Sequence, residues 1–198
     1  MRKSFRLLNS AIESSYNDVV SLVAFVPKFL TPQECDRVVE IAERIPAYEG
    51  GTGAGPDIKY DEARDSSVRF CFPSPETQWL FDKLEHALLR LNEGYQFELR
   101  GFYEGFQVAS YEPGGHYDWH MDIGKSSSSA RKLSMTAQLS NPADYDGGEL
   151  EFKATDELGP RDQGYLIVFP SFLLHRIRQV TRGKRISMVS WISGPPFR

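Results

Sequence analysis

Two overlapping His-x-Asp triplets lie in the segment YEPGGHYDWHMDIG, residues 111–124. They read His-Tyr-Asp at 116–118 and His-Met-Asp at 120–122, in a chain with only four histidines. The Pro-Gly-Gly before them argues against a helix, so we expect a strand. Alternate side chains of a strand share a face, which places both histidines and both carboxylates on the same side. Alternation therefore predicts a candidate metal site and does not choose between the triplets.

A third ligand is available in the segment VFPSFLLHRIRQVTRGKRISMVSW, which contains His175. Two histidines and one carboxylate on strands form the facial triad that holds Fe(II) in non-haem oxygenases. A hairpin centred near Arg182 would pair His175 with a residue near Val189. Arg185 would then lie four positions away, about 13 Å at roughly 3.3 Å per residue. Its planar guanidinium is suited to hold a carboxylate with two hydrogen bonds.

Three other interpretations use the same residues. A zinc hydrolase is disfavoured, because the i,i+4 pair His116 and His120 lacks the following Glu and does not lie on a predicted helix. A surface strand could simply show its polar residues to water. A β-sandwich that binds a ligand without turnover is the alternative from outside enzymology, and no G-x-S-x-G nucleophile motif suggests another chemistry.

The composition is that of an ordinary globular protein. The 198 residues suffice for one domain, with 40% hydrophobic and 25% charged residues. The net charge of -4 predicts no general attraction to nucleic acid or to an anionic membrane. Cys35 and Cys71 form no C-x-x-C unit, so a cysteine-based site is not expected. We expect a cytoplasmic protein without a membrane segment.

Helices are predicted only in the first half of the chain. Residues 19–30 read as a buried strand, and residues 31–46 as a helix with Thr31 as N-cap, Pro32 at the first position and Glu34 completing a capping box. A second helix is expected to begin in the same way at Ser74. The glycine-rich and then charged segment 49–67 is a loop and a candidate lid.

From residue 95 onward the pattern changes to short strands separated by turn residues. Eight runs are predicted as strands, and they read YQFELRGFY, FQVASY, HYDWHMDI, KLSMTAQLS, GELEFKA, GYLIVFP, FLLHRIRQV and KRISMVSWI. Such spacing favours an antiparallel sandwich or barrel. We therefore expect a single α+β, mainly β domain over residues 1–198, with helical support at about 19–94 and a β core at about 95–193.

The segment from Phe102 to Ile192 resembles the Fe(II)/2-oxoglutarate-dependent dioxygenases, specifically the prolyl 4-hydroxylase-like group with its bacterial and viral members. That pattern consists of a Tyr, a Gly, an aromatic residue, His-x-Asp, a GGEL-like turn, a His, and about ten residues later a basic residue followed by Trp. The matching residues here are Tyr111, Gly114, Tyr117, His120-Met121-Asp122, the run YDGGELEF, His175, Arg185 and Trp191.

The resemblance implies a double-stranded β-helix, or jelly roll, and a role for each matching residue. The implied metal ligands are His120, Asp122 and His175. The implied 2-oxoglutarate contacts are Arg185, Tyr111 and Gln138. Tyr117, His116 and Trp191 are candidates for substrate contacts or for supporting the metal site, with His116 and Asp118 otherwise on a solvated strand edge. Collagen-type members usually have Lys at the position of Arg185, which weakens an inference of a collagen-like substrate.

The resemblance also implies the reaction. Fe(II), 2-oxoglutarate and O2 would be required, and ascorbate is a further candidate. An unactivated C–H, most simply that of a prolyl residue in a protein or peptide, would be hydroxylated with succinate and CO2 as coproducts. A free amino acid or another small molecule is the alternative substrate, and residues 124–130 form a second candidate lid. The basic run HRIRQVTRGKR is interpreted as a solvated hairpin, because no aromatic stacking platform accompanies it.

Overall fold

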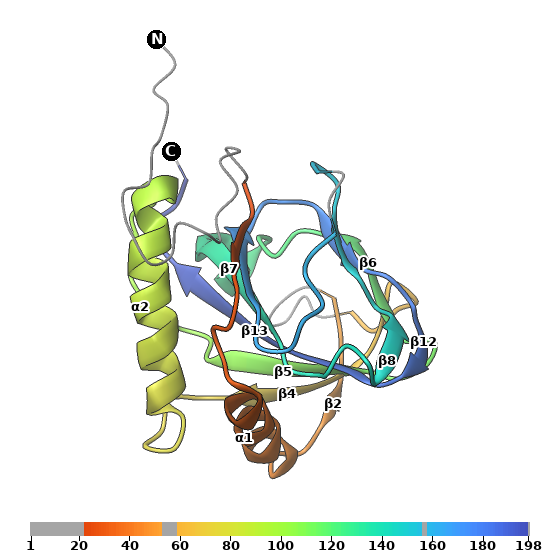
Figure 1. Cartoon of the computed structure of the whole chain (residues 1–198). Helices are drawn as coiled ribbons and strands as arrows, with labels where there is room; N and C mark the ends of the chain where they lie inside the picture. The colour runs from red at the N-terminus through yellow and green to blue at the C-terminus, as the bar shows by residue number, and fades with distance from the viewer. Residues whose placement is uncertain (1–21, 53–58, 156–157, 198) are drawn as a thin grey trace.

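Two antiparallel sheets face each other in the computed structural model of the chain, which describes residues 22–52, 59–155 and 158–197. The larger sheet has seven strands in the order β1-β10-β7-β13-β5-β4-β2, and a four-stranded sheet has the order β3-β6-β11-β9. The pair β12-β8 lies at one end, beside β6 in the view of Figure 1. This is the jelly roll that the resemblance implied, a double-stranded β-helix with helical support.

The strands of each sheet have the following bounds. In the large sheet they are β1 (Ala24–Val26), β2 (Tyr48–Glu49), β4 (Ser67–Cys71), β5 (Phe106–Tyr111), β7 (Arg131–Gln138), β10 (Leu166–Pro170) and β13 (Arg185–Ser193). In the smaller sheet and the end pair they are β3 (Arg64–Asp65), β6 (His116–His120), β9 (Leu150–Phe152), β11 (His175–Ile177), β8 (Tyr145–Gly147) and β12 (Val180–Gly183). A short 3-10 helix, Ser126–Ala130, precedes β7.

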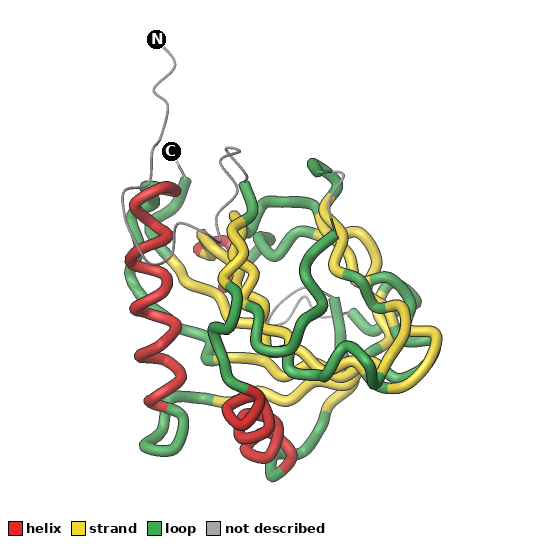
Figure 2. The backbone as a smooth tube through the Cα atoms, in the orientation of Figure 1, coloured by secondary structure: helices red, strands yellow, loops and turns green. Residues whose placement is uncertain are grey.

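Both helices cover one face of the large sheet (Figure 2). The predicted capping box opens α1 (Pro32–Glu43): the Thr31 hydroxyl accepts from the Glu34 backbone and the Glu34 carboxylate accepts from the Thr31 backbone. The predicted start of the second helix was wrong. Ser74 and Thr77 bond to each other in a turn instead, and α2 runs from Gln78 to Tyr95.

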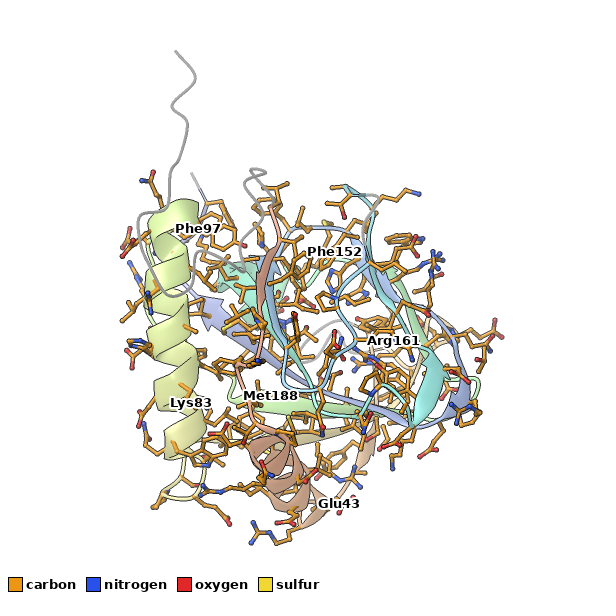
Figure 3. The ribbon with its side chains drawn as sticks, viewed as in Figure 1. Glu43, Lys83, Phe97, Phe152, Arg161 and Met188 are labelled. Carbon is orange, nitrogen blue, oxygen red and sulfur yellow. The ribbon has the colours of Figure 1, made fainter. Side chains whose placement is uncertain are left out.

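The large sheet packs against a different core on each of its two faces. One face, including Val108, Met135 and Met188, packs against the helices, and the other packs against the smaller sheet in a cluster that includes Phe152 and Phe169. Figure 3 shows Met188 and Lys83 on the helical side and Phe152 and Arg161 on the other. The space between the sheets is therefore the place where inward-facing polar residues can form a site.

Several predicted strands differ from the observed ones. The run YQFELRGFY forms no strand, because α2 extends to Tyr95 and residues 96–100 are irregular. The expected strand at 19–30 is reduced to β1, and its residues 19–21 lie outside the described part of the chain. The candidate lid is partly regular, since it contributes the last residue of β2, all of β3 and the first residue of β4, while its residues 53–58 lie outside the described ranges.

Neither helix in the described part of the chain combines the length and apolarity that crossing a bilayer requires.

We expect Gly183→Ala to destabilise the protein, because Gly183 ends β12 immediately before the strand that carries Arg185. Its φ of +70° is unfavourable for any L-residue, and a methyl group there would overlap the Asp144 carbonyl oxygen. The cost should be about 1–2 kcal/mol or more in the free energy of unfolding, measured in urea. Gly94→Ala in α2 is the matched control, since its methyl would meet no atom within 4 Å and should stabilise by about 0.5–1 kcal/mol. Equal stability of the two variants would contradict this account of Gly183.

Candidate active site

One cluster of metal-binding groups forms between the two sheets. His120 ends β6, Asp122 follows it by two residues, and His175 begins β11. Their ligand atoms all lie within 4.8 Å of one another. The Nε2 atoms of His120 and His175 each lie 3.8 Å from a different oxygen of the Asp122 carboxylate. The three side chains therefore converge on one point, and together they could hold a metal ion.

The backbone fixes which nitrogen each histidine presents. Nδ1 of His120 lies 2.7 Å from the Asp118 carbonyl oxygen, and Nδ1 of His175 lies 2.8 Å from the Leu173 carbonyl oxygen. A carbonyl can only accept, so both Nδ1 atoms carry the proton and donate it. The Nε2 lone pairs are left free to face the carboxylate, which is the arrangement that orients histidine ligands in metal sites.

An irregularity in β6 gives the two triplets different environments. His175 pairs with His120 and Ile177 pairs with Tyr117, so β6 contains one more residue than β11 over this interval. The predicted alternation is therefore wrong here. Tyr117 does not lie opposite His120 but stacks on it, with ring centroids 3.4 Å apart and planes 11° apart. The ring nitrogens of His116 instead lie 3.1 Å and 3.0 Å from the backbone carbonyl oxygens of Gly114 and Glu62.

The Asp122 backbone is held from both sides. Its N–H donates to the Ser171 carbonyl at 2.9 Å, and its own carbonyl accepts from Arg131 Nη1 at 3.0 Å. Arg131 is in turn fixed by two hydrogen bonds to Glu104, and its guanidinium lies 3.8 Å above the Trp191 ring. Trp191, a predicted neighbour of the site, is thus buried beneath Arg131, and its Nε1 has no hydrogen-bond partner among the described residues.

The charges of the three groups suit a cation. Burial lowers the pKa of His120 far below its usual range, and the facing His175 lowers it further, so the imidazole is neutral at pH 7. Burial by itself would raise the pKa of Asp122. The positive charges of the His175 and His120 rings in their protonated forms, the charge of Arg131 and a hydrogen bond from Ser134 outweigh burial and lower that pKa, so the carboxylate is ionised. Two imidazoles and one carboxylate form the donor set of a non-haem Fe(II) site.

Tyr117 connects the metal cluster to β3, where it pairs with Arg64. One face of its ring lies on His120, and the Arg64 guanidinium lies 4.5 Å from its ring centroid. Arg64 also donates to Ser66 Oγ and to the Gly51 carbonyl. Burial raises the pKa of Tyr117 to about 12, so its hydroxyl is protonated at neutral pH and can donate a hydrogen bond.

Arg185 reaches the same interior from the opposite sheet. We expected His175 to pair near Val189 in a hairpin with the Arg185 strand, and this is wrong. His175 pairs with His120 and Phe152 in the smaller sheet, whereas β13 pairs with β5 and β7 in the larger one. The two residues therefore lie in different sheets instead of along one hairpin.

The Arg185 guanidinium is buried with neutral partners only. The residue is 0% exposed, its Nη1 donates to Ser187 Oγ at 3.0 Å, and its Nη2 donates to Gln138 Oε1 at 3.1 Å. Its Nε has no partner, and no carboxylate pairs with it among the described residues. Tyr111 lies opposite it in the register, with its ring centroid 5.4 Å from Cζ. A buried cation in this state is suited to receive an anion.

The structure adds residues that the sequence analysis did not select. Ser187 could have been found, because it lies two positions from Arg185 and therefore on the same face of a strand. Arg131 and Glu104 pair across 27 positions, and no local pattern marks that contact. The basic run also differs from expectation: Arg176 lies over the Trp119 ring at 4.7 Å and binds Glu151, which also accepts from Arg178.

We expect metal binding to distinguish the two triplets. His120→Ala removes a converging Nε2 and should weaken binding of Fe(II), or of Co(II) as a spectroscopic substitute, by on the order of 100-fold or more. His116→Ala is the matched control from the other triplet and should leave the affinity within a few-fold of wild type. Anaerobic titration measures both. A loss at His116 with retention at His120 would contradict the site described above.

Comparison with known proteins finds similarity to oxygenases and hydroxylases. Residues 106–193 match the 2OG-Fe(II) oxygenase superfamily. A PKHD-type hydroxylase of Prochlorococcus marinus is 37% identical over 90 residues, which cover 44% of this chain but only 41% of that protein. A PKHD-type hydroxylase of Picosynechococcus sp. is 27% identical over 170 residues, covering 84% of this chain and 76% of that one.

Solved structures share the fold at low sequence identity. The viral collagen prolyl hydroxylase of Paramecium bursaria Chlorella virus-1, in its 2-oxoglutarate complex, superposes with a TM-score of 0.67 at 22% identity, covering 88% of this chain and 97% of that one. A Trichoplax adhaerens prolyl hydroxylase bound to a fragment of hypoxia inducible factor gives a TM-score of 0.71 at 16% identity, covering 86% and 83%. Residues 106–193 are therefore similar to the 2OG-Fe(II) oxygenase superfamily, and the chain has the double-stranded β-helix fold of solved prolyl hydroxylases.

Proposed function

We propose that this protein is a 2-oxoglutarate-dependent dioxygenase that hydroxylates a prolyl residue of a protein or peptide. The superfamily uses Fe(II), 2-oxoglutarate and O2. The observation that carries the proposal is the pairing of two complementary sites in one interior, a His-His-Asp cluster and a buried arginine without a carboxylate partner. The donor set fits Fe(II), and the arginine fits the distal carboxylate of 2-oxoglutarate.

The distance between the two sites follows from two residues of strand β7, one beside each site. Ser134 hydrogen-bonds Asp122 at one end, and Gln138 hydrogen-bonds Arg185 four residues farther along the same face. Four residues span about 13 Å of strand. A dicarboxylate with a keto group at one end can be bound by the metal there and by Arg185 at the other end.

Each residue then has a stated part in the reaction. His120, Asp122 and His175 would hold the metal, and Arg185 with Tyr111 would hold the cosubstrate. When bound, Fe(II) with 2-oxoglutarate and O2 supplies the oxidising power for an unactivated C–H, and succinate and CO2 are released. The buried side chains of Phe152 and Phe169 exclude water behind His175, whose ring is 6.1 Å and 4.7 Å from theirs. The Tyr117 hydroxyl is available to a group bound beside the metal.

The prolyl substrate rests on the related proteins, and a free amino acid or small molecule is the alternative. The solved neighbours include prolyl hydroxylases, one of them bound to a peptide fragment. A binding module without turnover is disfavoured, because both the metal ligands and the buried Arg185 are retained together.

We expect two successive results from the purified protein. Under anaerobic conditions Fe(II) and 2-oxoglutarate should give the visible charge-transfer band of a chelated keto acid, and in air the protein should form succinate. Proline-containing peptides should accelerate succinate formation and gain one oxygen atom by mass spectrometry. Arg185→Met removes the anion partner and should raise the KM for 2-oxoglutarate about 10- to 150-fold, the effect of losing a charge-assisted hydrogen bond.

The outcomes separate the alternatives. Acceleration and oxidation of a free amino acid in place of any peptide would replace the prolyl substrate and keep the dioxygenase. A band without succinate formation under any condition would favour the binding module. The absence of a band in the wild-type protein would overturn the proposal.

A further inference from the structure

Both ends of the Gln138 amide are already used inside the protein. Gln138 is 2% exposed on β7. Its Oε1 accepts from Arg185 Nη2 at 3.1 Å, and its Nε2 donates to the Pro160 carbonyl oxygen at 3.1 Å. The carbonyl of Pro160 can only accept, so it fixes the orientation of the amide. Rotating the amide by 180° would turn its NH2 toward the guanidinium and its oxygen toward the Pro160 carbonyl, losing both hydrogen bonds.

The segment that carries Pro160 is itself held in place. The next residue, Arg161, donates from Nη2 to the Tyr145 carbonyl at 2.7 Å and lies over the Tyr145 ring at 4.5 Å. Tyr145 is almost completely buried, and its ring borders Gly148, where a methyl group would also meet Arg185. Pro160, Arg161 and Tyr145 are therefore linked by contacts behind Gln138.

The charge of this environment matters as much as its geometry. Ser187 and Gln138 orient the Arg185 guanidinium, but neither of them is an anion. Two neutral acceptors fix the position of the group and leave its positive charge uncompensated. A carboxylate at either position would form an internal ion pair and remove the electrostatic reason for binding an external anion.

We propose that Gln138 is a positioning residue that aims Arg185 at the cosubstrate and keeps its charge available, and is not itself a cosubstrate contact. This inference rests on the proposed function, because it assigns Arg185 to the distal carboxylate of 2-oxoglutarate. It differs from the role that the family resemblance implied for Gln138, which was a direct cosubstrate contact. It also assigns Pro160 and Arg161 the role of fixing the amide orientation.

The test compares two substitutions of similar size. Gln138→Glu places a carboxylate against Arg185, and the guanidinium favours its ionised form. We expect its affinity for 2-oxoglutarate in the presence of Fe(II), measured anaerobically, to fall about 10- to 150-fold. Gln138→Met removes the amide and adds no charge, so Arg185 still lacks an anion. Because Arg185 then loses one of the two partners that aim it, the affinity should fall by about 2- to 10-fold, less than in Gln138→Glu.

In thermal unfolding without 2-oxoglutarate, the order of stability of the two variants should be the reverse of their order of affinity for 2-oxoglutarate. Gln138→Glu gives Arg185 an internal partner and should unfold at a higher temperature than Gln138→Met, which leaves both Arg185 Nη2 and the Pro160 carbonyl without a partner. A general folding defect would lower both the stability and the affinity of the same variant. The opposite order of the two measurements is therefore specific to the positioning role.

Pyruvate is the matched ligand control, because it has the same keto-acid group and no second carboxylate. Neither substitution should change the pyruvate affinity of the Fe(II)-loaded protein, and the Fe(II) affinity should be unchanged as well. Equal loss of 2-oxoglutarate binding in both variants would show that the amide contacts the cosubstrate directly. Unchanged binding in Gln138→Glu would also overturn the inference. If the wild-type protein binds Fe(II) but not 2-oxoglutarate, the proposed function fails first, and this inference fails with it.

Discussion

The site depends on a guanidinium group that is completely buried and has no carboxylate partner among the described residues. Removing a charge from water is costly unless hydrogen bonds and an opposite charge compensate it. Arg185 has the hydrogen bonds, to Ser187 and Gln138, but its Nε and its net charge are left uncompensated. A fold selected for stability alone would place a carboxylate or an apolar side chain here. In the proposed function, the distal carboxylate of the cosubstrate supplies the missing negative charge when it binds.

Each of the two sheets supplies a different part of the site. The smaller sheet supplies His120 and His175 from adjacent strands, with each Nδ1 bound to a backbone carbonyl, so the ligand geometry is set by main-chain positions. The larger sheet supplies Arg185 and the two residues that orient it. Because the sheets are joined by the packed interior around Phe152 and Phe169, the separation of the two halves is fixed before any ligand binds. Preorganisation of this kind lowers the ordering cost of binding.

Local sequence rules predicted much of this and failed at identifiable places. The capping box of α1 was correct because all its contacts lie within four residues. Inward alternation held along β13, where Arg185 and Ser187 share a face. It failed at β6, because a bulge depends on the partner strand and not on the residues that contain it. The pairing of His175 near Val189 failed for a related reason: the chain between them changes sheets, through β12 and its pairing with β8, and no short-range signal marks such a change.

The bulge also explains how two overlapping His-x-Asp triplets can have different environments. A regular strand would present His116 and His120 to the same side, and both could compete for one metal. The additional residue in β6 shifts the register after Tyr117, so that Tyr117 lies on His120 while His116 turns to the carbonyls of Gly114 and Glu62. Only the second triplet then has its carboxylate facing His175. The pairing of β6 with β11, which lie more than fifty residues apart in the chain, thus gives the two triplets different environments. The local pattern of the triplets does not predict this difference.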